Sequence, residues 1–193
     1  MPNWCHNTLT VTGEAELLQR FVAAARPTDA VIEENYRTWK SYTGEQKPTL
    51  EEYRKQVIGM QPLSFESFKP MPASESENWY EWNIANWGTK WDASFGQPFI
   101  ALGDEGMDPE KSAEAHGVTD TPTVAVYKFD TAWTPPIPVL QAMSDQHTEL
   151  EFVLRFAEVG NDYAGEMKWV SGVLIDEEEL KVTEVLAPEE MWF

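Results

Sequence analysis

Four short segments of this chain carry apolar residues at every second position, and this alternation limits its possible folds more than any other feature. In residues 5–12, Cys5, Leu9 and Val11 fall on one side, and His6 with three threonines falls on the other. The same alternation recurs in three later segments, residues 123–131, 150–156 and 163–173. A period of two is typical of a strand with one buried face and one face toward solvent. The chain therefore predicts an antiparallel sheet that is covered on one side.

Two other segments show the helical period of 3.6. Glu14–Ala25 has an apolar stripe and glutamates in its first turn, where the helix dipole favours negative charge. Pro135–Ser144 is expected to be capped by Thr134 and to accept prolines in its first turn. A further strand is predicted to start at Lys90–Asp92, and the hairpin of residues 150–173 adds one extra strand at its C-terminal end. This order contains the βαββαβ plan of a ferredoxin-like sandwich, an α+β fold with helices on one face of an antiparallel sheet.

The length of 193 residues predicts one domain, residues 1–193, with two additions. Residues 28–60 are interpreted as a helical insertion. Val31–Trp39 has a helical pattern, and Thr49 with Glu52 forms a capping box that opens a second short helix. Residues 96–121 are rich in glycine, proline and acid, and predict a long irregular acidic loop.

The charge of the chain is strongly negative and unevenly distributed. Thirty-three acidic residues against 14 Lys and Arg give a net charge of −19, of which residues 104–193 carry −15 and residues 1–103 carry −4. Such a field disfavours direct binding to nucleic acid or to an anionic membrane, and it attracts a basic protein surface. We therefore expect a non-enzymatic protein-binding module whose partner is a host protein with a basic surface. The acids expected at this interface are Asp104, Glu105, Asp108, Glu110, Glu114, Asp176, Glu177, Glu178 and Glu179.

Three explanations of the acidity and of the interface stay open. The carboxylates could imitate the phosphates of DNA and occupy the DNA site of a host nuclease. The interface could instead lie on aromatic residues of the insertion, namely Tyr36, Trp39, Tyr42 and Tyr53, with Trp39 as its main candidate. The acid could also serve solubility alone.

Catalysis is not expected, although Cys5 and His6 stand next to each other. Neighbouring residues of a strand point to opposite faces, so Cys5 is predicted to be a packed thiol rather than a nucleophile activated by His6. The alternative is a hydrolase or nuclease that uses Cys5 and His6 or a pair of carboxylates. The histidines lack the spacing of zinc ligands, and residues 104–110 do not fit a calcium-binding loop. We therefore predict no metal and no cofactor.

The composition also suggests where the protein is found. A single cysteine cannot form an internal disulfide, and the N-terminus lacks the basic start and apolar run of a signal peptide. No apolar run approaches the roughly 18 residues of a membrane span. We expect the protein in the cytoplasm of the bacterial host.

The tryptophans form motifs, because the dipeptide Asn-Trp occurs at residues 3–4, 78–79 and 86–87. A buried indole N–H needs an acceptor, which favours a structural role inside the domain. An exposed aromatic anchor for a partner is the alternative. The residues predicted to be structural are Trp4, Asn86, Trp87, Gly88, Trp91, Asp92 and Trp133.

Three segments that contain these tryptophans, residues 1–13, 86–92 and 129–136, resemble the signature of YubB-like proteins, which phages and plasmids carry. The resemblance implies a ferredoxin-like domain and an origin in a mobile element. It implies no activity, and it brings no catalytic residues to this chain.

Overall fold

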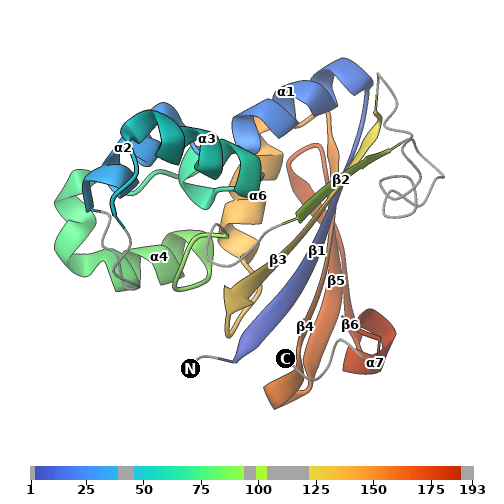
Figure 1. The fold of residues 1–193 in the computed structure, drawn as a ribbon. Coiled ribbons are helices and arrows are strands. Elements are labelled where there is room, and N and C mark those ends of the chain that lie inside the picture. Colours follow the sequence, from blue (N-terminus) through green and yellow to red (C-terminus); the bar gives the residue numbers. More distant parts are fainter. Residues whose placement is uncertain (1–2, 39–45, 94–98, 104–121, 188–193) are drawn as a thin grey trace.

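The computed structural model describes residues 3–38, 46–93, 99–103 and 122–187. Its centre is one antiparallel sheet with the strand order β2-β3-β1-β4-β5-β6 (Figure 1). The strands are β1 (Trp4–Thr12), β2 (Phe99–Gly103), β3 (Val124–Ala132), β4 (Glu151–Glu158), β5 (Tyr163–Val170) and β6 (Val173–Leu180). The order of the first four strands in this sheet, together with α1 and α6, is that of the predicted βαββαβ sandwich, and the α+β fold class is confirmed.

The helices lie mainly on one side of the sheet. They are α1 (Ala15–Ala25), α2 (Asp29–Thr38), α3 (Leu50–Met60), α4 (Trp79–Trp87), α6 (Ile137–Gln146) and α7 (Val182–Val185). Short 3-10 turns are η1 (Phe65–Ser67), η2 (Ala73–Asn78) and η3 (Val159–Asn161). Helices α1 and α6 lie together against one face, whereas α7 lies on the opposite face (Figure 1). None of the described helices has the length and apolar character needed to cross a bilayer.

The core follows from the alternation in the strands. Leu9 and Val11 of β1 face the same side as Phe152 and Leu154 of β4, and all four are fully buried. Phe21 of α1 packs among these side chains, so the apolar stripe of the first helix covers the apolar face of the sheet. On the other face, a second and smaller cluster joins α7 to β4 and β5 through Ala157, Ala164, Val182 and Leu186.

Three local predictions were wrong. The strand expected from Lys90 does not form there, because Asp92 accepts hydrogen bonds from the turn at residues 64–66. The strand that takes this place in the fold is β2, which lies inside the segment 96–121 that was predicted to be a loop. Thr134 does not cap the helix of residues 137–146, since its hydroxyl donates to the carbonyl of Gly88 instead. The acidic run 176–179, expected to follow the hairpin of residues 150–173 outside any strand, lies within β6, a further strand that pairs with β5.

The insertion is a pair of helices, α2 and α3. Its capping box is confirmed: the Thr49 hydroxyl accepts from the Glu52 amide, and the Glu52 carboxylate accepts from the Thr49 amide at 2.8 Å. Arg54 of α3 reaches acids of α2, with its Nε 3.3 Å from Asp29. Ion pairs therefore link the two helices, and each helix also buries an apolar side chain, Ile32 in α2 and Val57 in α3.

Candidate functional site

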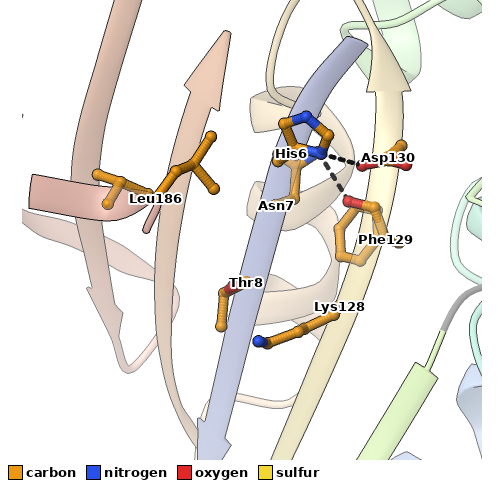
Figure 2. Close-up of a pocket in the computed structure, with 8 residues that line it drawn as sticks. His6, Asn7, Thr8, Lys128, Phe129, Asp130 and Leu186 are labelled. Carbon is orange, nitrogen blue, oxygen red and sulfur yellow. Dashed lines mark hydrogen bonds and ion pairs between the residues drawn. The ribbon is translucent and has the colours of Figure 1, made fainter. Parts of the chain in front are cut away.

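The sheet face opposite α1 and α6 carries the polar half of the alternating pattern. His6 and Thr8 of β1 lie beside Asp130 and Lys128 of β3, and His6 Nδ1 is 2.7 Å from Asp130 Oδ1. Figure 2 shows these side chains on neighbouring strands, with Leu186 across the hollow that they line. The cavity is small, about 260 Å³. It is below the range of roughly 300–1,000 Å³ that is usual for small-molecule sites.

Farther across the same face, acids and bases of neighbouring strands pair. Arg155 of β4 lies 3.1 Å from Glu166 of β5, and Lys168 of β5 lies 2.7 Å from Glu151 of β4. Opposite charges placed across two strands stabilise their pairing by a few tenths of a kcal/mol to about 1 kcal/mol. The inner strands of this face are therefore close to charge balance.

The balance ends at β6, which is the outermost strand of the sheet. Asp176, Glu177, Glu178 and Glu179 are all exposed. Within the described part of the chain, no Lys, Arg or His nitrogen lies within ion-pair distance of these four carboxylates. Glu178 even stands directly across from Glu166, and like charges in this position repel. Lys168 stands across from Asp176, but its ammonium group forms its ion pair with Glu151. The strand thus presents four exposed carboxylates without an ion pair along the edge of the sheet.

The first residues of β6 are apolar and also exposed. Val173 and Ile175 keep 59% and 56% of their surface exposed, in a protein whose other strands bury most such side chains. The register with β5 is irregular beside Lys168 and Trp169, which leaves Ile175 without a directly opposed residue. From Asp176 to Leu180 the pairing is regular. Strand β6 therefore begins with apolar residues, has a bulge at Ile175, and continues as a regularly paired acidic segment.

The aromatic segment of residues 86–92 occupies a different position, between helix α4 and the end of β3. Trp87 is buried, and its indole N–H donates to the carbonyl of Lys69 at 2.9 Å. Gly88 ends α4 with φ 84°, a left-handed conformation that suits glycine. Thr89 exchanges hydrogen bonds with the backbone of Ala132, so this segment is tied to β3.

Asp92 completes this arrangement. Its carboxylate accepts hydrogen bonds from the Ser64 hydroxyl at 2.6 Å and from the Phe65 amide at 2.7 Å. Asn86 donates its side-chain amide to the carbonyl of Trp82. We call residues 86–92 the clasp, because they join α4, β3 and the turn at residues 64–69.

The remaining tryptophans of the predicted motif lie next to the clasp. Trp4 and Trp91 are tilted against each other at 6.1 Å, and the ammonium group of Lys90 lies 4.3 Å from the Trp91 ring. Trp133 is partly exposed and has φ 67°, which is rare for a bulky residue. Its amide donates to the carbonyl of Asn3, which helps to hold this conformation. The structure thus brings all seven predicted motif residues into one region around the clasp.

Cys5 and His6 lie on opposite faces of the sheet, as expected from their adjacent positions in β1. Cys5 is fully buried among core residues, and this burial raises the pKa of its thiol to about 12. A thiol becomes a nucleophile as the thiolate, which such a pKa suppresses at neutral pH. His6 shares its face with Asp130, but Cys5 is not there to be activated.

A larger cleft, about 600 Å³, opens between α2 and the segment that contains η1 and η2. Glu66 and Asp92 line it together with Trp87. Burial raises the pKa of Glu66, and the negative charge of Asp92 adds to this shift, while a hydrogen bond from the Met71 amide opposes it. Glu66 accepts from an amide of its own loop and Asp92 accepts from the distant turn at residues 64–66, so hydrogen bonds within the fold explain the positions of both carboxylates.

Several predicted interface residues lie outside the described residues. These are Asp104, Glu105, Asp108, Glu110, Glu114, Trp39 and Tyr42. The rings of Tyr36 and Tyr53 of the insertion are tilted against each other with centroids 5.6 Å apart, and the Tyr36 hydroxyl donates to the carbonyl of Pro48. Across the parts of the chain that are described, no cluster of three or more His, Cys, Asp or Glu side chains is arranged to hold a metal.

Two features of the site were not predicted from sequence. The pairing of His6 with Asp130 depends on strand register, because 124 residues separate them in the chain. The placement of the acids on an edge depends on strand order, which no local pattern reveals. A partial signal existed, since Lys128 and Asp130 interrupt the apolar run of β3 at every second position.

Comparisons with known proteins agree on the fold. A family model described as a ferredoxin-like domain in Api92-like protein matches residues 113–186, which is less than half of the chain. The crystal structure of protein Api92 from Yersinia pseudotuberculosis superimposes with a TM-score of 0.57. That match covers 93% of this chain and 98% of the other at 11% identity. It shows a shared fold alone. No curated protein sequence matches the chain significantly.

The resemblance to YubB-like proteins stays a prediction. The similarities found are to Api92-like proteins, and nothing in them bears on phages, plasmids or a specific activity.

Proposed function

We propose that this chain is a non-enzymatic protein-binding module that docks its acidic outer strand on a basic surface of a host protein. The observation that supports this most is the row of carboxylates at Asp176–Glu179, all exposed and without cationic partners among the described residues. On β4 and β5 the chain pairs its charges, and on β6 it does not. Uncompensated charge lowers the stability of the free protein, and a basic partner would remove that cost.

The charge of the whole chain favours the same partner. Residues 104–193 carry a net charge of −15, so the field near β6 attracts cationic surfaces and accelerates encounters. This attraction weakens with salt, because the Debye length falls from about 10 Å at 0.1 M to about 3 Å at 1 M. Binding should therefore be fast at low salt and much weaker at high salt.

DNA mimicry is the finer form of this proposal. An extended strand advances about 3.4 Å per residue, and each strand of double-stranded DNA carries one phosphate per about 3.4 Å of helix axis. Four consecutive acids on β6 therefore match the linear charge density of one DNA strand, although their side chains alternate between two faces. The corresponding target is a protein that handles nucleic acid. The resemblance to phage and plasmid proteins supports a host protein as that target.

The test is capture of partners from a bacterial lysate with four forms of the protein, one of which is Trp39→Ala. The parent is compared with a variant in which Asp176 becomes Asn and the three following glutamates become Gln. A matched control neutralises four exposed acids elsewhere, Glu14, Glu77, Glu81 and Glu149. The proposal expects a partner that the control retains, that the β6 variant loses, and that added double-stranded DNA displaces.

Other outcomes would point to the alternatives. Loss of the partner only in Trp39→Ala would move the interface to the insertion, where salt should matter little. Equal loss of the partner in the β6 variant and in the control would mean that binding depends on net charge alone and not on β6. A parent that captures no partner would leave solubility as the reason for the acidity.

An enzyme is the rival reading, and the observation in its favour is the contact of His6 with Asp130 beside Lys128. Cys5 provides a direct test of its thiol version. A pKa near 12 leaves roughly a thousandfold less thiolate at pH 8 than a thiol of pKa 9 has. We expect native Cys5 to react with iodoacetamide more than a thousandfold more slowly than the unfolded chain does. Rapid reaction of the native protein would contradict the non-enzymatic proposal.

A further inference from the structure

Among the described residues, β6 has a neighbouring strand on one side only, and we consider its other side as an edge along which another strand can pair. In the described part of the chain β6 is bonded to β5 only, and β5 itself lies between two strands. The outward amides and carbonyls of an edge strand therefore have solvent as their partner, which makes such an edge a template for an added strand. From Asp176 to Leu180 the register is regular, so the backbone there is straight enough to pair.

We infer that β6 binds its partner by strand addition, and that the occupant is an extended basic segment of the partner protein. This inference rests on the proposed function, because it takes a basic protein as the partner. The added strand would continue the sheet beyond Asp176–Leu180. Its lysines and arginines would lie opposite Asp176–Glu179, with side chains alternating between the two faces of the sheet.

Charge decides which strand can occupy the edge. A second copy of this chain would bring acids opposite acids, and like charges in directly opposed positions destabilise strand pairing. A basic strand reverses the sign of every one of these contacts. The acids thus protect the edge against self-association while they select a cationic occupant.

The apolar start of β6 adds a second element of recognition. Val173 and Ile175 are more than half exposed, and charge does not protect them as it protects the following residues. The bulge at Ile175 interrupts the edge, so regular pairing is expected to begin at Asp176. A β-branched residue next to the basic run of the partner would cover Ile175. The predicted occupant is therefore a basic run of about four residues that is flanked by valine, isoleucine or threonine.

The test uses synthetic peptides and the full-length protein. The probe is Val-Lys-Arg-Lys-Arg-Val, whose order of basic and apolar residues reads nearly the same in either strand direction. Binding is measured by titration of isotope-labelled protein, with amide exchange followed along β6. Two modified probes carry N-methyl groups at residues one, three and five or at residues two, four and six. Both keep every charge of the probe, and each removes the N–H groups along one side of the strand.

Strand addition uses only one side of the peptide. The expected result is at least tenfold weaker binding for one N-methylated probe, near-parent binding for the other, and slower amide exchange in Asp176–Leu180 with the unmodified probe. Equal binding of all three probes would overturn strand addition and leave charge-driven docking intact. Equal loss for both modified probes would overturn it as well, because a sheet edge contacts one side only.

Two further outcomes separate this inference from the proposed function. If the unmodified probe does not bind, strand addition is wrong, and the lysate capture still judges docking on a folded basic surface. If the probe binds the variant neutralised at Asp176–Glu179 as tightly as it binds the parent, charge does not select the occupant, and the inference fails.

Discussion

The clasp and β6 both carry side chains that draw attention in the sequence, and the protein uses them in opposite ways. In the clasp, Trp87, Thr89 and Asp92 each bond to backbone or side-chain atoms of another segment. In β6, the side-chain carboxylates of the four acids have no hydrogen-bond or ion-pair partner among the described residues, and they face solvent. The comparison teaches that a conspicuous motif is explained by the fold when its polar atoms have internal partners. Where internal partners are lacking among the described residues, the fold leaves the motif unexplained, and the docking proposal starts from that observation.

The largest effect on stability is expected in the clasp, where the side chains are buried. Trp87→Ala should lower the free energy of unfolding by about 3–5 kcal/mol, because it removes a buried ring and leaves a cavity next to Phe65. Urea denaturation followed by circular dichroism measures the loss. Trp79→Ala is the matched control, since Trp79 is 38% exposed and should cost far less. Similar losses in both variants would contradict the structural role of Trp87.

A smaller loss is expected at Asp92. Asp92→Ala removes the acceptor of the Ser64 hydroxyl and the Phe65 amide and should cost about 2–3 kcal/mol. The comparison with β6 is direct, because Asp176→Ala removes the same side chain from an exposed site and should change stability little. The two unfolding curves are measured side by side. A larger loss at Asp176 would mean that β6 is stabilised by its acids, and would contradict this prediction.

The stability of the fold should also depend on pH through His147, which packs edge-on against Phe21 and Phe68. Burial lowers the pKa of His147 in the folded protein. The unfolded chain therefore binds the proton more readily, and stability should fall as pH drops below the ordinary histidine pKa of about 6.5. His147→Gln should reduce the difference in melting temperature between pH 7 and pH 5. An unchanged difference would assign the dependence to other groups.

The smallest expected effect has the opposite sign. Neutralising Glu178, which faces Glu166 across the strand pair, should raise stability by no more than about 0.5 kcal/mol. Glu77→Gln, on an exposed turn, serves as the control for net charge. Chemical denaturation at low salt detects the difference, and added salt should reduce it. A loss of stability in Glu178→Gln would show that the acids of β6 are paired within the fold.

The sequence predicted most of the sandwich because its signals are local. The alternation of Cys5, Leu9 and Val11 and the capping box at Thr49 each act within a few residues. The strand expected at Lys90 failed because Asp92 is used by a distant turn, which local patterns do not show. The acids of β6 were identified by charge, but their place on the sheet edge depends on the order of strands. That order is decided by long-range packing.

Amide hydrogen exchange of β6 in the captured complex tests the central claim most directly. In the free protein, the outward-facing amides of Asp176–Leu180 should exchange quickly, since the strand lies at the edge of the sheet and is exposed. We expect the partner to slow exchange in this segment and to leave α4 and the clasp unchanged. Protection confined to α2 and α3, with β6 exchanging as in the free protein, would contradict it.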